Sequence, residues 1–116
     1  MQCSQRLQMD FNDVKEFLMA LGDEKRQAII VTLLQQPTCK GLRVTDLTEA
    51  TQLSRPAVSH HLKILKQAGV VDVKSAGTKN YYYLSPDTSE IDKMLQLLQQ
   101  VKLLIHTKQA IVIQEK

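Results

Sequence analysis

The sequence is poor in aromatic residues: its 116 residues include no Trp, three Tyr and two Phe. A core must therefore be built from Leu, Ile and Val, and a chain of this length has room for a single modest core. No apolar run reaches the roughly 18 residues that a membrane-spanning helix needs. The first residues, M-Q-C-S-Q-R-L-Q-M-D, also lack the apolar centre of a signal peptide. We therefore expect one cytoplasmic domain without a membrane segment.

Cysteine and histidine are scarce as well. Two cysteines, Cys3 and Cys39, cannot form a disulfide framework, and a reducing cytosol would keep them as thiols. Of the three histidines, His60 and His61 are adjacent, and neighbours on a helix point about 100° apart, so they are poorly placed to share a metal ion. No acid, nucleophile or glycine-rich loop is placed to assist them. We expect neither enzyme activity nor a cofactor.

The net charge of +3 is small, but basic residues are concentrated in one part of the chain. The window from residue 55 to residue 80 holds five basic residues and one acidic residue, whereas the rest of the chain is nearly balanced. Such a patch indicates a polyanionic partner, and a solvated lysine face is the alternative. The charged residues of the window are Arg55, Lys63, Lys66, Lys74 and Lys79 against Asp72.

Apolar residues recur at helical spacing in the first third of the chain. We expect a helix over residues 11–21 that ends at Gly22, preceded by a flexible tail over residues 1–9. A second helix is expected to be capped by Asp23 and to stop before Pro37. The buried side of this second helix should consist of Ile29, Ile30, Leu33 and Leu34.

A short helix over residues 44–51 and a longer helix after Ser54 are separated by only three residues, Q-L-S. Ser54 is a good N-cap, and Pro56 suits the first helical turn, where its missing N–H costs nothing. Gly69 is expected to end the longer helix in the left-handed conformation. The buried stripe of this helix should be Val58, Leu62 and Leu65.

After Gly69 the spacing of apolar residues changes from about 3.6 to 2. The β-prone runs V-V-D-V-K-S and N-Y-Y-Y-L-S flank the turn A-G-T-K, which predicts a hairpin. Asp87 and Glu90 then have the spacing of a capping box that opens a long helix. The apolar stripe of this helix is broader than one small core requires, so we expect another chain to cover part of it.

A short helix, a tight turn, a second helix and a hairpin together make a winged helix-turn-helix, here in a mainly α fold with a small β-hairpin wing. In such a unit the second helix lies in the DNA major groove and nearby basic residues meet phosphates. Because one side of the helix after Ser54 is buried, its other side is expected to face DNA, with His61 at the boundary of the core. The residues expected to contact DNA are Arg55, Pro56, Ser59, His60, Lys63, Lys74, Thr78 and Lys79.

The run S-R-P-A-V-S-H-H-L-K-I-L-K-Q-A-G-V-V, preceded by L-G-D-E-K-R-Q-A-I and followed by G-T-K-N-Y-Y-Y-L, resembles the ArsR/SmtB family of bacterial transcriptional repressors. The most specific part is the pattern S-x-x-x-V-S-H-x-L-x-x-L-x-x-x-G. The resemblance covers roughly residues 10–106. It implies a homodimer that binds an inverted-repeat operator in double-stranded DNA and releases it when an inducer binds.

The resemblance also implies how the chain is divided. Residues 10–106 would form the DNA-binding and dimerisation domain, residues 1–9 a flexible tail, and residues 107–116 a tail or an extension of the last helix. The dimer would be built on the first and last helices. The side chains expected at its interface are Phe11, Val14, Leu18, Met94, Leu97, Leu98, Val101, Leu104 and Ile105.

The usual metal sites of this family are not matched by the sequence. Where the family's metal sensors carry thiolates in a segment like E-L-C-V-C-D-L, this chain has G-L-R-V-T-D-L, with Arg43 and Thr45 in place of the cysteines. A soft-metal site needs thiolates, and a guanidinium repels a cation. The second family site needs Asp-x-His in the last helix, but Asp92 is followed by Lys and Met, and the only histidine of that helix is His106. The resemblance therefore implies no metal at either site.

Three alternatives stay open. Cys3 and Cys39 could serve a thiol- or metal-responsive sensor, which for a disulfide requires Cα atoms within about 7 Å. A winged helix could instead dock another protein, although the basic window favours DNA. The chain could also be a regulatory domain of an enzyme, although it carries no catalytic set of residues.

Overall fold

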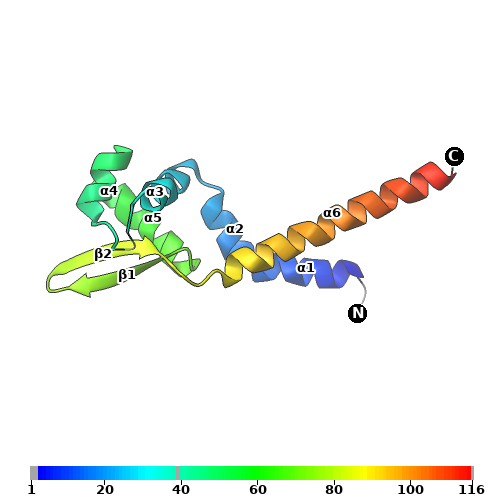
Figure 1. Cartoon of the computed structure of the whole chain (residues 1–116), viewed down its shortest axis with the longest axis horizontal. Helices are drawn as coiled ribbons and strands as arrows, with labels where there is room; N and C mark the ends of the chain where they lie inside the picture. Colours follow the sequence, from blue (N-terminus) through cyan, green and yellow to red (C-terminus); the bar gives the residue numbers. More distant parts are fainter. Residues whose placement is uncertain (1–2, 39, 116) are drawn as a thin grey trace. The chain divides into compact units, whose positions relative to one another are not determined.

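The computed structural model describes residues 3–38 and 40–115, and within these ranges it contains six α-helices and one two-stranded antiparallel sheet (Figure 1). The chain divides into two compact units. The central unit is the stretch Lys15–Asp87, and the terminal unit combines the residues up to Val14 with those from Thr88 onwards. No helix in the described ranges is both long and apolar enough to cross a membrane.

The central unit has the order helix, helix, helix, helix, hairpin. One small core holds it together, in which Ile29, Leu47, Val58 and Leu65 have no exposed surface. These side chains come from three helices, so the three helices are fixed by the same contacts. The elements are α2 (Lys15–Leu21), α3 (Glu24–Leu34), α4 (Val44–Thr51), α5 (Arg55–Gln67), β1 (Val71–Ala76) and β2 (Lys79–Leu84).

Helix α3 begins where the sequence predicts. The Asp23 carboxylate accepts hydrogen bonds from the backbone N–H groups of Lys25 at 2.8 Å and Arg26 at 3.0 Å, which satisfies two free donors at the helix start. The expected burial of Ile29 and Leu33 is confirmed, but Leu34 is 65% exposed, so its expected burial is wrong. Ile29 and Leu33 lie four residues apart on one row of the helix surface, and Leu34 lies about 100° away from that row.

The helix-turn-helix is formed by α4 and α5, and local signals set its boundaries. Helix α4 ends at Thr51 and is followed by its C-cap, Gln52, which has a left-handed backbone with φ +61°. The Ser54 hydroxyl then caps α5 by accepting a hydrogen bond from the N–H of Ala57 at 3.3 Å. At the far end Gly69 has φ +80°, and the following N–H, of Val70, donates to the carbonyl of Leu65 at 2.9 Å. The predicted cap, stop and buried stripe of α5 are confirmed.

The hairpin is also confirmed. Strands β1 and β2 pair antiparallel up to Ala76 and Lys79, which leaves a two-residue turn of Gly77 and Thr78. Gly77 has φ +65°, the positive value that a two-residue hairpin turn requires at this position. Tyr82, in β2, packs against the core of the central unit. The wing therefore extends directly from the same core as the helix-turn-helix.

The terminal unit consists of α1 (Cys3–Asp13) packed against α6 (Ser89–Glu115). The single helix expected over residues 11–21 is wrong, because the chain breaks at Val14, whose N–H donates to the carbonyl of Phe11 three residues back. Asn and Asp just before the break have low helix propensity. The segment expected as a flexible tail contains neither Gly nor Pro and is helical from Cys3. Of the two alternatives for the C-terminal segment, the helix extension is the one found, as far as Glu115.

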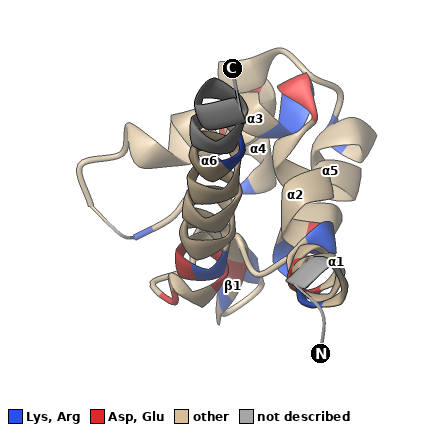
Figure 2. Cartoon of the chain, turned by 90° about the vertical axis from the view of Figure 1, so that its right-hand side faces the viewer, with Lys and Arg blue, Asp and Glu red and all other residues tan. Residues whose placement is uncertain are grey.

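Helix α6 has two apolar stripes with different environments. Leu97 is 3% exposed, and Met94, Val101 and Leu104, at heptad spacing around it, are partly buried. Charged residues gather at the N-terminal end of α6 and are followed by an uncharged stretch over residues 94–101 (Figure 2). The second stripe stays exposed and consists of Ile91, Leu95, Leu98 and Ile105.

Candidate nucleic-acid interface

The outward face of α5 is basic and free of acids. Because Val58, Leu62 and Leu65 are buried, the opposite side of the helix is exposed to solvent. The helix contains no Asp or Glu, and within the described part of the chain none of its basic residues forms an ion pair with a carboxylate. The exposed residues on this face are Arg55, Pro56, Ser59, His60, Lys63 and Lys66. Their cationic groups are available to an external polyanion.

The hairpin adds further basic side chains to the central unit. Strand β1 contacts α5, which as the second helix of the helix-turn-helix is its recognition helix. The wing is therefore next to the recognition helix in space as well as in sequence. Lys74 lies in β1, and Thr78 and Lys79 lie at the turn and the first position of β2. All three are exposed. The eight residues that the sequence predicts as DNA contacts are thus all exposed, and their contact with DNA stays a prediction.

The adjacent histidines of α5 have different surroundings. His60 is exposed, whereas His61 is only 8% exposed, and their ring centroids are 5.5 Å apart with planes tilted by 60°. His61 Nδ1 lies 3.3 Å from Nη1 of Arg26, in α3. Burial lowers the pKa of His61, the positive charges of Arg26, His60 and Lys25 lower it further, and the carboxylate of Asp23 acts in the opposite direction. His61 is therefore buried, and its surroundings favour the neutral form of the ring over the charged form.

Arg26 is the functional candidate that sequence reasoning missed. Its Nε donates to the carbonyl of Ala20 at 2.9 Å and its Nη2 donates to the carbonyl of Met19 at 3.1 Å, so it caps the C-terminal end of α2 while it contacts His61. Nothing in the spacing of a single arginine near a helix start indicates a partner 35 positions away. The contact depends on how α2, α3 and α5 pack.

The metal hypothesis can be compared with the described residues, whereas the thiol hypothesis concerns Cys3 and Cys39. Among the residues that the structure describes, no group of three or more His, Cys, Asp or Glu side chains could hold a metal ion. Cys39 and the Cys3 side chain lie outside the described part of the structure. Where family metal sensors carry thiolates, the backbone N–H of Arg43 donates to the Asp46 carboxylate at 2.9 Å and Thr45 is exposed. This segment forms the first turn of α4.

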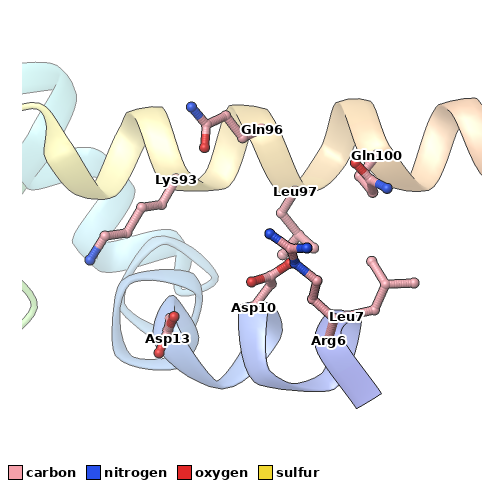
Figure 3. A pocket seen from close by; sticks show the side chains of 8 residues that line it. All are labelled: Arg6, Leu7, Asp10, Asp13, Lys93, Gln96, Leu97 and Gln100. Carbon is pink, nitrogen blue, oxygen red and sulfur yellow. The ribbon is translucent and has the colours of Figure 1, made fainter. Parts of the chain in front are cut away.

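Each unit contains a hollow among its described residues. In the terminal unit a groove of about 620 Å³ lies between α1 and α6, with Leu97 among its lining residues (Figure 3). In the central unit a smaller hollow of about 230 Å³ lies beside the end of α3 and β2, lined in part by Leu34, Pro37 and Tyr83. The groove between α1 and α6 is lined by one further apolar residue, Leu7, and otherwise by polar or charged residues. These are Arg6, Asp10, Asp13, Lys93, Gln96 and Gln100.

A short helix, a tight turn, an outward-facing basic helix and a hairpin on one core define a winged helix-turn-helix DNA-binding protein. Comparison with known proteins agrees with this class. Residues 23–73 match the model of the bacterial regulatory protein, arsR family. The chain is 34% identical over 89 residues to an uncharacterized HTH-type transcriptional regulator of Methanocaldococcus jannaschii, a match that covers 76% of this chain and 97% of that protein.

A second relative is the arsenical resistance operon repressor of Staphylococcus aureus, 32% identical over 77 residues, or 66% of this chain and 70% of that protein. The solution structure of the homodimeric winged helix-turn-helix DNA-binding domain of a possible ArsR-family regulator from Mycobacterium bovis has the same fold, with a TM-score of 0.62 and 22% identity over 91% of this chain and 93% of that one. The chain belongs to the ArsR family. It is a DNA-binding transcriptional regulator and not an enzyme.

Proposed function

We propose that this regulator is a homodimeric repressor that occupies an inverted-repeat operator, with α5 of each protomer in a major groove. The observation that carries the proposal is the outward face of α5, which is basic, free of acids and opposite a fully buried stripe. Arg55 and Lys63 lie on this face, near Ser59 and His60, whose side chains can hydrogen-bond base edges or phosphates. The wing residues Lys74, Thr78 and Lys79 would contact adjacent phosphates.

Dimerisation is supported by the exposed stripe of α6. Ile91, Leu95, Leu98 and Ile105 lie on one side of the helix and remain in solvent within a single chain. A row of large apolar side chains of this kind is typical of a protein interface. The homodimeric M. bovis domain shows that a protein of this fold dimerises.

The set of interface residues expected from the sequence needs one adjustment. Val14 and Leu97 are already buried within the chain, so they have almost no surface left for a partner. Phe11, Leu18, Leu98 and Ile105 are exposed and stay in the proposed interface. Met94, Val101 and Leu104 are partly buried and would contribute at its edge.

Repression by operator occupancy is supported by the relative in S. aureus, which is a repressor of an arsenical resistance operon. A dimer that covers two half-sites about 34–36 Å apart occupies more than one helical turn of DNA, which is enough to exclude polymerase from an overlapping promoter. A reporter gene behind the selected operator should therefore be expressed less when the regulator is present. Higher expression would indicate an activator.

The test begins with selection of binding sites from a random DNA library by the wild-type protein. We expect an inverted repeat whose half-site centres are separated by one helical turn. Arg55→Ala and Lys63→Ala should each weaken binding to the selected site by about tenfold or more, as expected when one base-specific or phosphate interaction is removed. Lys15→Ala, an exposed lysine of α2, is the matched control and should bind like wild type.

The protein-docking alternative predicts a different result from the same material. DNA binding through phosphate contacts weakens steeply as salt concentration rises, because condensed counterions are released. A flat response to salt, or wild-type affinity of both α5 variants, would contradict the proposed interface.

A further inference from the structure

The C-terminal end of α2 is held by a side chain from the next helix. Helix ends leave backbone carbonyls without partners, and α2 has only seven residues, so its end depends on outside donors. The guanidinium of Arg26 supplies two, to the carbonyls of Ala20 at 2.9 Å and Met19 at 3.1 Å. The Gln27 amide adds a third, to the carbonyl of Leu21 at 2.7 Å. Side chains from the first turn of α3 therefore hydrogen-bond the last turn of α2.

The same guanidinium reaches the recognition helix. Its Nη1 lies 3.3 Å from Nδ1 of His61. An arginine carries only donors and stays protonated in proteins, so in this contact Nδ1 must be the acceptor. An imidazole that accepts at Nδ1 has its proton on Nε2 and is neutral. The contact thus specifies both the tautomer and the charge of His61.

We infer that Arg26 is a positioning residue for the recognition helix α5. Through its contact with neutral His61, Arg26 fixes the rotation of α5 about the helix axis. The inference rests on the proposed function, because it concerns the face that α5 presents to DNA. His61 is next to His60 and two residues before Lys63, both of which lie on that face. A turn of α5 about its axis that released His61 would move both of these side chains. Arg26 sets this rotation by joining α5 to the end of α2.

Burial favours the neutral ring of His61, and the neighbouring positive charges act in the same direction. From α3 the ring faces Arg26 and Lys25, and from its own helix it faces His60. Asp23, the cap of α3, acts in the opposite direction and attracts a proton to the ring. Protonation of Nδ1 would remove the acceptor and place a second positive charge 3.3 Å from the guanidinium. A proton on His61 therefore breaks the link between α2 and α5.

Two isosteric substitutions of His61 separate this link from simple packing. In His61→Asn the amide oxygen takes roughly the position of Nδ1 and can accept from Arg26, whereas in His61→Gln it takes roughly the position of Nε2 and cannot. We expect His61→Asn to bind the selected operator within about threefold of wild type. We expect His61→Gln and Arg26→Gln each to lose about tenfold or more, the effect of one charge-assisted hydrogen bond. The operator affinity of Arg26→Lys should lie between that of wild type and that of Arg26→Gln. Lysine keeps the positive charge but lacks the several N–H donors of a planar guanidinium.

Operator affinity measured as a function of pH distinguishes the link from packing, because a purely packing role of His61 would not depend on its protonation. It is measured in the His60→Asn background, so that His61 is the one histidine of α5 that titrates. Because the folded pKa of His61 lies below 6.5, affinity should be constant above pH 6.5 and should fall as pH decreases through the lowered pKa. The His60→Asn, His61→Asn double variant should show no such fall. Equal pH dependence of the two proteins would overturn the inference.

Nitrogen chemical shifts of the imidazole test the link without DNA. We expect the Nε2–H tautomer of His61 at pH 7 in the wild-type protein, and loss of this preference in Arg26→Gln. A cationic ring, or an Nδ1–H tautomer, would overturn the inference even if His61→Gln failed to fold. If Arg55→Ala, Arg26→Gln and His61→Gln all bind like wild type, the proposed DNA face is wrong. If only Arg55→Ala loses affinity, the face stands and the positioning role is wrong.

Discussion

Leu42 and Tyr82 exchange two backbone hydrogen bonds, each 2.8 Å long. Leu42 lies two residues before α4, and Tyr82 lies in the middle of β2. The wing is therefore attached at two places, by its connection to α5 and by this bridge to the start of the helix-turn-helix. The bridge fixes where the hairpin stands relative to the two helices, and its geometry depends on the residue that precedes Leu42.

That residue is Gly41, and its replacement by alanine should destabilise the protein strongly. Gly41 has φ +93°, and a Cβ there would lie 2.6 Å from the carbonyl oxygen of Tyr82, which is backbone and cannot rotate away. Strain at such a position costs about 1–3 kcal/mol, and the clash with the bridge adds to it. We expect Gly41→Ala to lower the free energy of unfolding in urea by about 3 kcal/mol or more.

Two other glycines are matched controls for this substitution. Gly77 has φ +65° but open space around the Cβ position, so Gly77→Ala should cost about 1 kcal/mol from backbone strain alone. At Gly22 a Cβ would make ordinary contacts of 3.5 and 3.7 Å, so Gly22→Ala should change stability by less than about 0.5 kcal/mol. Equal losses for Gly41→Ala and Gly77→Ala would show that the bridge is not a close approach.

A substitution in the exposed stripe of α6 should abolish dimerisation without unfolding the protein. Leu98 lies within the stripe and is 53% exposed, so Leu98→Glu adds no buried charge to the single chain but would bury one in the proposed interface. We expect this variant to be a folded monomer by analytical ultracentrifugation, with little affinity for the full operator. Leu103 is 62% exposed and lies about 120° around the helix from Ile91, so Leu103→Glu should remain dimeric. A dimeric Leu98→Glu protein would contradict the interface.

The wing makes a prediction about salt dependence. Lys74 and Lys79 are exposed on the hairpin, without acidic partners among the described residues. If each lysine neutralises a phosphate, its replacement by alanine lowers the slope of log affinity against log salt by about 1. The Lys74→Ala, Lys79→Ala variant should therefore bind all DNA sequences more weakly and with a shallower slope, while its preference among sequences is unchanged. A change of preference would place these residues at base edges instead.

Asp23 predicts how stability responds to acid. The hydrogen bond from the Arg26 backbone N–H lowers the pKa of this carboxyl below its ordinary value of 3.8, and the N–H of Lys25 acts in the same direction. A depressed carboxyl pKa contributes stability that is present above about pH 3.8 and is lost as pH falls through the folded pKa. Asn caps helices without titrating, so Asp23→Asn should show a smaller loss of stability between pH 5 and pH 2 in urea titrations. Parallel curves for the two proteins would show that the cap does not titrate.

The sequence was most informative where one short segment contains its own signal. Ser54, Pro56 and Gly69 mark the ends of α5 through hydrogen bonds and backbone angles that involve only neighbouring residues. The change of spacing after Gly69 predicted the hairpin for the same reason. The outward face of α5 followed from its buried stripe by helix geometry alone. The predicted DNA contacts rest on this local reasoning.

Prediction was less successful where an element can pack in more than one way. Residues 11–21 have a continuous apolar spacing, but the chain divides at Val14 because one part packs with α6 and the other belongs to the central unit. Helix α6 has two apolar stripes, and nothing in their composition shows that Leu97 is buried while Leu98 is exposed. Such choices depend on contacts with residues far away in the chain.

By itself, then, the sequence determined the order of helix, turn, helix and hairpin and the face of α5 that is free to meet DNA, because caps, turns and periodicity are local properties. Only the tertiary structure decided that Arg26 contacts His61 and that Leu42 pairs with Tyr82. Both contacts join segments 35 or more positions apart, and they form only when several helices share one core. The surface proposed to meet DNA thus follows from local sequence signals, whereas the contacts that hold α5 in place are a product of the fold.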